Sequence, residues 1–195
     1  HLHPAMAAVL LPMRFITAMR WELPWETVAP VTTPEAFVAR LRQLDAETPA
    51  GERLLTWGYH QLWHGEMSRQ LINGVSATRP IIVWHRSFHE LYMNDGALAW
   101  LGIDAGDAGR RNQIDIERGH FFENGLGYAI SRLNPHIMSQ ECFHDGLERL
   151  RQVAHYGGLT TLGDMATGIF DFDMEWEGAK AILDQPDTPF RTVFV

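Results

Sequence analysis

Two long segments of the chain carry apolar residues at helical spacing. The first follows Thr33, a residue type that favours helix N-caps, and has Pro34 at its first helical position. Its apolar residues recur at helical spacing: Phe37, Val38, Leu41 and Leu44. The second segment, 139–156, ends at Gly157-Gly158. Its apolar residues show the same period: Phe143, Leu147, Leu150 and Val153. We predict a helix in each segment, the first with one apolar face at the surface.

Shorter apolar runs predict strands and short helices that alternate along the chain. The strand-like runs are "RFITAMRWEL", "RLLTWGY", "RPIIVWH", "GLTTLGDM" and "FRTVFV". The helix-like runs are 5–13, "EMSRQLING", "NDGALAWLGI" and a stretch around 175–184. The order helix, strand, helix, strand after residue 139 is typical of a parallel sheet, so the pattern predicts an α/β fold.

Composition and charge narrow the class of protein. The 195 residues are 46% hydrophobic and 21% charged, as in a globular chain of about one domain. A net charge of −8 and scattered arginines argue against nucleic-acid binding. The chain has no run of 18 apolar residues, and its single cysteine, Cys142, allows no internal disulfide. We expect a cytoplasmic protein without a nucleic-acid or membrane partner.

Histidines provide the first candidate chemistry. His1 and His3 flank one leucine, and on a strand both imidazoles would lie on one face, within reach of one zinc ion. They could equally be tag residues, or His3 and a free α-amino group could bind Cu(II) or Ni(II). Two further pairs are four residues apart, His60 with His64 and His85 with His89. Their aromatic surroundings favour packing over metal binding.

Several further motifs were considered as catalytic or ligand-binding sites. Asp164 closes the predicted strand "GLTTLGD", where catalytic residues of parallel barrels gather, although an aspartate there can also cap the next helix. The acidic run "DFDMEWE" lacks the pattern of a calcium loop and indicates a solvated loop and helix start. No nucleophilic-serine or phosphate-binding glycine motif is present. Several aromatic residues are compatible with an apolar ligand group, but we favour packing: Trp57, Trp63, Trp84, Phe88 and Tyr92.

Five segments, in this order, resemble the amidohydrolase superfamily, specifically amidohydrolase family 3, the YtcJ-like metal-dependent hydrolases: "HLHP", "GYHQLW", "RPIIVWHRSFHELYMNDGALAWLGI", "GHFFEN" and "YGGLTTLGDM". The resemblance implies the N-terminal part of the catalytic region, a partial (β/α)8 TIM barrel of about strands 1–3 with a large α+β insertion. The expected domains are 1–20, with the first barrel strand; 21–138, the insertion; and 139–195, a barrel helix, strand 2, a helix and strand 3.

The resemblance also assigns residues. It makes His1 and His3 the first two metal ligands, and it places His89, Asn94 and Glu123 in substrate binding. The family's remaining ligands would lie beyond the last residue, so we expect part of an enzyme. As two histidines fill only half of a tetrahedral zinc site, the chain alone should be inactive and bind zinc weakly.

Two departures from the family pattern concern the substrate. Arg86-Ser87-Phe88 stands where the family commonly has a small residue and glycine, and Asp95 stands where serine is common.

The implied function is hydrolysis of amide-type C–N bonds, in N-acyl or N-formyl compounds, by water activated on one or two divalent ions, with zinc expected. The expected partner is a small-molecule substrate, and the sequence is compatible with a homo-oligomer. The alternative is a non-catalytic α+β module that binds a ligand or regulatory partner, with incidental N-terminal histidines.

Overall fold

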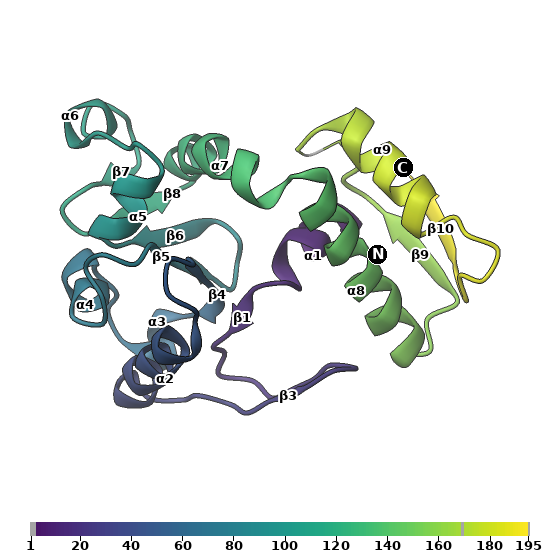
Figure 1. Ribbon diagram of the computed structural model, residues 1–195, viewed down its shortest axis with the longest axis horizontal. Coiled ribbons are helices and arrows are strands. Elements are labelled where there is room, and N and C mark those ends of the chain that lie inside the picture. The colour runs from purple at the N-terminus through teal and green to yellow at the C-terminus, as the bar shows by residue number, and fades with distance from the viewer. Residues whose placement is uncertain (1–2, 169, 195) are drawn as a thin grey trace. The chain divides into compact units, whose positions relative to one another are not determined.

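The computed structural model describes residues 3–168 and 170–194 (Figure 1). The chain divides into two compact units. Unit 1 comprises His1–Met13, Glu22–Glu26 and Asn134–Val195, and unit 2 comprises Arg14–Trp21 and Thr27–Leu133. Each unit has its own sheet. The fold is mixed α/β, as the alternation of predicted elements indicated.

Unit 2 is built on a six-stranded mixed sheet of order β1-β4-β5-β6-β8-β7. Its strands are β1 (Arg14–Phe15), β4 (Leu54–Tyr59), β5 (Ile81–His85), β6 (Glu90–Met93), β7 (Ile114–Asp115) and β8 (His120–Phe122). The pairs β1–β4 and β4–β5 are parallel, and the other pairs are antiparallel. Because the parallel strands end at one edge, polar residues that follow them gather there.

Helices connect these strands. They are α2 (Pro34–Glu47), α3 (Gln61–His64), α4 (Arg69–Asn73), α5 (Asp95–Trp100) and α6 (Ala105–Ala108); α7 (Asn124–Ile137) continues from unit 2 into unit 1. The Thr33 hydroxyl accepts a hydrogen bond from the Ala36 N–H at 3.2 Å, which confirms the predicted start of α2. The apolar face of α2 packs on the sheet in a core that includes Phe37, Leu41, Leu44, Leu54, Ile81 and Val83.

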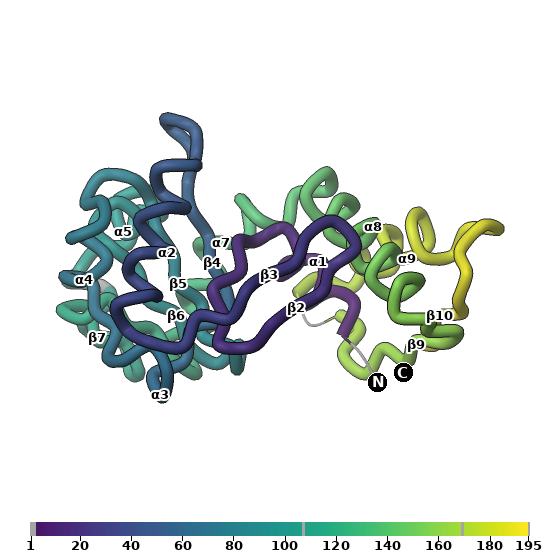
Figure 2. Tube along the Cα trace, turned by 90° about the horizontal axis from the view of Figure 1, so that it is seen from below, coloured from purple at the N-terminus to yellow at the C-terminus, as the bar shows by residue number. Residues whose placement is uncertain are grey.

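Unit 1 contains a two-stranded parallel sheet, covered by helices. Its elements are α1 (Pro4–Leu10), α8 (Gln140–Tyr156), β9 (Thr161–Asp164), α9 (Phe172–Ile182) and β10 (Arg191–Phe194). Figure 2 shows α9 beside α8. Helix α1 approaches α8 closely at Gly146, where a Cβ atom would lie 1.9 Å from the carbonyl oxygen of Ala8. Only glycine fits at this crossing.

Most predicted elements are confirmed, with three exceptions. The strand predicted for "RFITAMRWEL" is wrong, because only β1 and β2 (Trp21–Glu22) are extended; β2 pairs with β3 (Thr27–Val28). Helix α9 begins before 175, since the Asp171 carboxylate accepts a hydrogen bond from the Met174 N–H at 2.9 Å. Helix α7 was not predicted, because Gly125, Gly127 and Pro135 interrupt its pattern.

Within the described residues, no helix is long and apolar enough to cross a membrane.

Candidate functional site

The predicted metal ligands lie at the start of unit 1. His3 immediately precedes α1, and its carbonyl accepts a hydrogen bond from the Ala7 N–H at 2.9 Å. His1 lies outside the described residues, so the geometry of the His-x-His pair stays a prediction. Among residues 3–168 and 170–194, no group of three or more His, Cys, Asp or Glu side chains could hold a metal ion. The described donors therefore do not form a metal centre by themselves.

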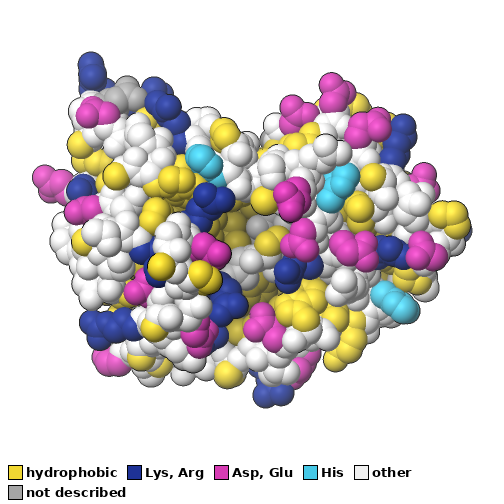
Figure 3. Space-filling model, viewed as in Figure 1, with side chains coloured by type: hydrophobic (Ala, Val, Ile, Leu, Met, Phe, Trp, Pro, Cys, Tyr) yellow, Lys and Arg dark blue, Asp and Glu magenta, His cyan; other side chains and the backbone are white. Residues whose placement is uncertain are grey.

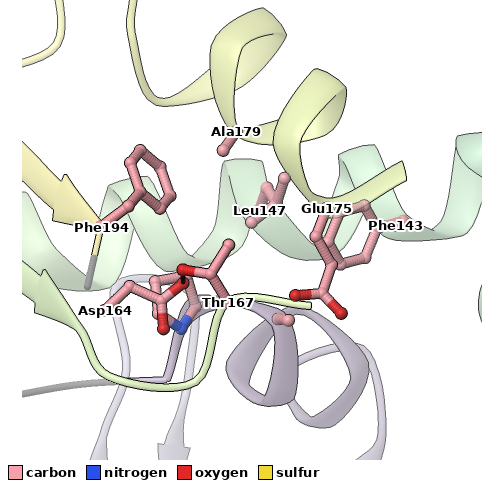
Figure 4. Close-up of a pocket in the computed structure, with 9 residues that line it drawn as sticks. Phe143, Leu147, Asp164, Thr167, Glu175, Ala179 and Phe194 are labelled. Carbon is pink, nitrogen blue, oxygen red and sulfur yellow. Dashed lines mark hydrogen bonds between the residues drawn. The ribbon is translucent and has the colours of Figure 1, made fainter. Parts of the chain in front are cut away.

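A small cavity of about 10 Å³ lies in unit 1, at the carboxyl ends of β9 and β10 (Figure 4). This is close to the smallest space that holds a water molecule. It is lined by Pro4, Ala5, Phe143, Leu147, Asp164, Thr167, Glu175, Ala179 and Phe194. The lining combines two carboxylates and a hydroxyl with apolar side chains, so a polar group inside would be partly screened from solvent.

Asp164 is the last residue of β9 and is buried. Its Oδ1 accepts a hydrogen bond from the Ala166 N–H at 3.0 Å. Its Oδ2 accepts one from the Thr167 hydroxyl at 3.0 Å, which Figure 4 shows. Asp171, rather than Asp164, caps the next helix. The helix-cap alternative for Asp164 is therefore wrong, and its carboxylate keeps acceptor capacity beyond these two bonds.

Glu175 organises the loop between β9 and α9. Its carboxylate accepts hydrogen bonds from three backbone N–H groups: Gly168 at 2.6 Å, Phe170 at 2.7 Å and Asp171 at 3.1 Å. Only 4% of the residue is exposed. The prediction that the acidic run is solvated is therefore wrong for Glu175, because its charge is stabilised by backbone donors inside the fold.

In unit 2 the structure brings two of the three predicted substrate-binding residues together. His89 lies in the turn between β5 and β6, and Glu123 follows β8. His89 Nδ1 is 3.3 Å from Glu123 Oε1, and the Glu123 N–H donates to the His89 carbonyl at 3.0 Å. Both side chains are exposed, 68% for His89 and 56% for Glu123. The pair is thus accessible to a small molecule.

The backbone around this pair is strained. Among the described residues, three that are not glycine have a positive φ: Phe88 at 68°, Gln113 at 67° and Glu123 at 48°. They lie close together, because Gln113 accepts hydrogen bonds from the N–H groups of Phe122 and Asn124, which flank Glu123. A left-handed backbone is costly for such residues and is found more often at functional sites.

Asn94, the third predicted substrate-binding residue, is fully buried and caps α5. Its Oδ1 accepts hydrogen bonds from the N–H groups of Ile81 and Ala97, both at 2.9 Å. Its Nδ2 donates to the carbonyls of Ser76 at 2.6 Å and Arg79 at 2.8 Å. The amide thus makes all four of the hydrogen bonds open to it, and a ligand would have to displace one of them.

The i, i+4 histidine pairs contain buried, packed members, as the aromatic surroundings indicated. His64 accepts a hydrogen bond from the His60 N–H at Nδ1, 3.0 Å away, and its Nε2 is 2.9 Å from the Val31 carbonyl. His85 lies between Ser87 and Gln61. Burial lowers the pKa of both His64 and His85, so both rings are neutral near pH 7.

One polar cluster in unit 2 was not predicted. His120 Nε2 lies 2.5 Å from Glu90 Oε2, and the His120 ring stacks on Tyr92 at 4.2 Å. Glu90 Oε1 is also 3.7 Å from His85 Nδ1. Burial raises the pKa of the Tyr92 hydroxyl. The antiparallel pairing of β6 with β8 creates this cluster, and no local sequence pattern indicates that pairing.

Charged side chains of both signs are interspersed on the face that Figure 3 shows. Ion pairs within single units include Arg79 with Asp45 at 2.5 Å, Arg118 with Glu66 at 2.6 Å, and Arg151 with Asp187 at 2.7 Å. On this face, charged side chains of the two signs are therefore mixed rather than gathered in one large patch.

No protein-family model and no curated protein matches the sequence. The whole chain is nevertheless similar in fold to two solved structures. One is an uncharacterized metal-dependent hydrolase from Pyrococcus horikoshii OT3, with a TM-score of 0.67 and 16% identity. The other is an uncharacterized metal-dependent hydrolase from Pyrococcus furiosus, with a TM-score of 0.64 and 17% identity. The match covers 100% of this chain but only 35% and 36% of theirs. Identities this low show similarity of fold.

Proposed function

We propose that this chain is part of a metal-dependent hydrolase. The observation that carries the proposal is the fold similarity of the entire chain to two metal-dependent hydrolases. Because the chain spans about a third of their length, the proposed activity is that of a longer protein that includes it. The chain alone is expected to be inactive.

We further propose that unit 1 belongs to a (β/α)8 barrel and that most of unit 2 is an insertion. Helix α9 joins the parallel strands β9 and β10, which is the repeating unit of such a barrel. Parallel sheets are normally larger and covered on both faces, so two paired strands fit a sheet with further members. The proposed domain limits remain 1–20, 21–138 and 139–195.

Our proposed metal ligands are His1 and His3. Imidazole nitrogen suits zinc and other borderline metals, so the donor chemistry fits a divalent ion. The pair would supply two ligands, and the others would come from outside the described residues. When bound, the ion would make water more acidic and polarise the substrate carbonyl.

The chain's own residues would hold the substrate and the surrounding loops. Glu123 occupies His89 Nδ1, so Nε2 is left to hydrogen-bond a substrate oxygen or N–H group. Asp164 fixes the start of the loop that follows β9 through Ala166 and Thr167. The proposed substrates are N-acyl or N-formyl compounds with an amide-type C–N bond. An amide has a carbonyl acceptor and an N–H donor, and the imidazole and carboxylate of the His89–Glu123 pair can hydrogen-bond such groups.

A Co²⁺ titration followed by visible absorption tests the metal ligands. Wild type and His155→Ala, an exposed histidine of α8, should bind one Co²⁺ weakly. Both His1→Ala and His3→Ala should lose that binding. A parallel Cu²⁺ titration separates the alternative, because a site formed by the terminal amine and His3 survives His1→Ala. Co²⁺ binding that is unchanged in both variants contradicts the proposed ligands.

A further inference from the structure

Three polar side chains lie in line where the parallel strands β4 and β5 end. His85 is the last residue of β5, Ser87 follows it, and Gln61 follows β4. His85 Nδ1 is 2.7 Å from the Ser87 hydroxyl oxygen, and His85 Nε2 is 3.1 Å from Gln61 Oε1. A hydroxyl, an imidazole and a third group that orients the imidazole form the pattern of an activated nucleophile. This pattern is recognised by geometry rather than by a sequence motif.

Hydrogen bonds fix which nitrogen of His85 carries the proton. The Ser87 N–H donates to His85 Nδ1 at 3.1 Å, so Nδ1 is the acceptor nitrogen of the ring. In a neutral imidazole the other nitrogen is then the donor, and Nε2 donates to the amide oxygen of Gln61. The lone pair of Nδ1 therefore faces Ser87, where it can take the proton of the hydroxyl.

The hydroxyl is accessible, whereas the base behind it is shielded. Ser87 is exposed, and only 6% of His85 is exposed. The His89 N–H donates to Ser87 Oγ at 3.2 Å, which positions the oxygen. A hydroxyl oxygen has two lone pairs, so the second can attack a carbonyl carbon that approaches from solvent.

Charged and titratable groups around His85 suit a base that becomes cationic only for a short time. Burial, the largest effect, lowers the pKa of His85, and positive charge on His60, Arg86 and His120 also lowers it. The ring is therefore neutral near pH 7. The Glu90 carboxylate acts in the opposite sense, because its Oε1 lies 3.7 Å from His85 Nδ1 and would stabilise a proton taken up there.

We propose that Ser87 is a nucleophile activated by His85 and that it cleaves aryl esters of carboxylic acids without a metal. Ser87 Oγ attacks the ester carbonyl carbon while its proton moves to His85 Nδ1. The bond between the acyl carbon and the aryl oxygen breaks, the phenolate leaves with the electron pair, and the Nδ1 proton passes to it. Water then attacks the acyl-serine and gives a proton to Nδ1. Oγ leaves the acyl carbon and recovers that proton, which releases the carboxylic acid.

Aryl esters are the substrate class that this arrangement suits best. A phenolate is a stable leaving group, so it departs without a separately placed general acid. The activity uses residues of unit 2 alone and no metal ligand, so it goes beyond the proposed metal-dependent hydrolase function and does not depend on it.

Two probes of the chain, kept in EDTA to exclude metal, test this inference. A fluorophosphonate reacts with activated serines, and peptide mass spectrometry should place its label on Ser87. Release of p-nitrophenolate from p-nitrophenyl acetate measures the esterase rate. Ser87→Ala should abolish the label and lower the esterase rate at least about tenfold. Ser131→Ala is the matched control, because Ser131 is an exposed serine of unit 2 whose hydroxyl donates to a backbone carbonyl.

Two variants test the roles of His85 and Gln61. His85→Gln keeps a polar side chain but removes the base, so labelling of Ser87 should slow at least about tenfold. Gln61 is an exposed positioning residue, and Gln61→Glu places a carboxylate beside Nε2. This charge stabilises the imidazolium and raises the pKa of His85, so the pH of half-maximal labelling should rise by about one unit. A purely structural role for Gln61 would not move that pH.

Three outcomes would overturn the inference. The first is a label that Ser87→Ala does not remove, or no label at all. The second is an esterase rate that Ser87→Ala lowers no more than Ser131→Ala does. The third is a pH profile that Gln61→Glu leaves unchanged. Because EDTA is present throughout, Co²⁺ binding by the histidines of unit 1 is a separate result, and a failure here refutes only the serine site.

Discussion

Replacing Asn94 with alanine tests the structural role of its buried side-chain amide. The variant loses the N-cap of α5, which costs about 1 kcal/mol. It also leaves the Ile81 N–H without its side-chain acceptor and two carbonyls, of Ser76 and Arg79, without their side-chain donor. Each buried group that stays unpaired costs roughly 1–3 kcal/mol. Because the chain can relax around part of this loss, we expect the free energy of unfolding to fall by about 3–5 kcal/mol.

Urea unfolding and amide hydrogen exchange measure this effect. The Ile81 and Ala97 amides, which donate to Asn94 Oδ1, should exchange faster in Asn94→Ala. Asn112→Ala is the matched control, because Asn112 is exposed and its loss should change stability by less than about 0.5 kcal/mol. An Asn94→Ala protein within about 1 kcal/mol of wild type would refute the reasoning, since four buried hydrogen bonds would then contribute almost nothing.

Three further predictions concern packing, pH and loop order. Gly146→Ala should lower the stability of unit 1 by about 2 kcal/mol in thermal unfolding, because the new Cβ would collide with the Ala8 carbonyl; an unchanged Tm would show that α1 can move away. Burial lowers the pKa of His64 below its ordinary 6.5, so stability is full above pH 6.5 and falls as the pH drops below it. His64→Gln should therefore flatten the change in Tm between pH 7 and pH 5, and an equally steep profile would exclude His64 as a cause. Glu175→Ala should speed amide exchange in the loop after β9 about tenfold, because three N–H groups lose their acceptor; unchanged rates would contradict that role.

The elements that could be predicted from the sequence are those with local signals. Helix α2 begins where Thr33 and Pro34 indicate, because an N-cap and a fixed φ act within a few residues. Helix α8 begins after Ser139, whose hydroxyl accepts a hydrogen bond from the Cys142 N–H at 3.3 Å, and it ends at the predicted glycine, Gly157. Such signals do not depend on the rest of the fold.

The remaining features depend on contacts between distant parts of the chain. His89 and Glu123 meet because β6 pairs with β8, and periodicity does not indicate which strands pair. The resemblance to a known family had grouped the two residues without giving their geometry. Glu175 was interpreted as solvated because a charge run is usually exposed, and only the folded loop provides its three backbone donors.

The same limit explains the different environments of the candidate residues. A sequence motif marks Asn94 and His89 alike, yet one is fully buried and the other is 68% exposed on its side chain. Burial decides whether a polar group is occupied by the fold or available to a ligand. The burial of a residue follows from the packing of the fold, which the sequence motif alone does not determine.

Zinc K-edge X-ray absorption of the zinc-loaded chain tests the central claim most directly, because it reports the ligands of the metal themselves. The proposed site predicts two imidazole ligands with Zn–N distances of about 2.0–2.1 Å in wild type. It predicts that His3→Ala shows no zinc with imidazole ligands, and that the His155→Ala control gives the wild-type spectrum. A wild-type spectrum without histidine ligands, or one that His3→Ala leaves unaltered, would contradict the assignment of this chain to a metal-dependent hydrolase through His1 and His3.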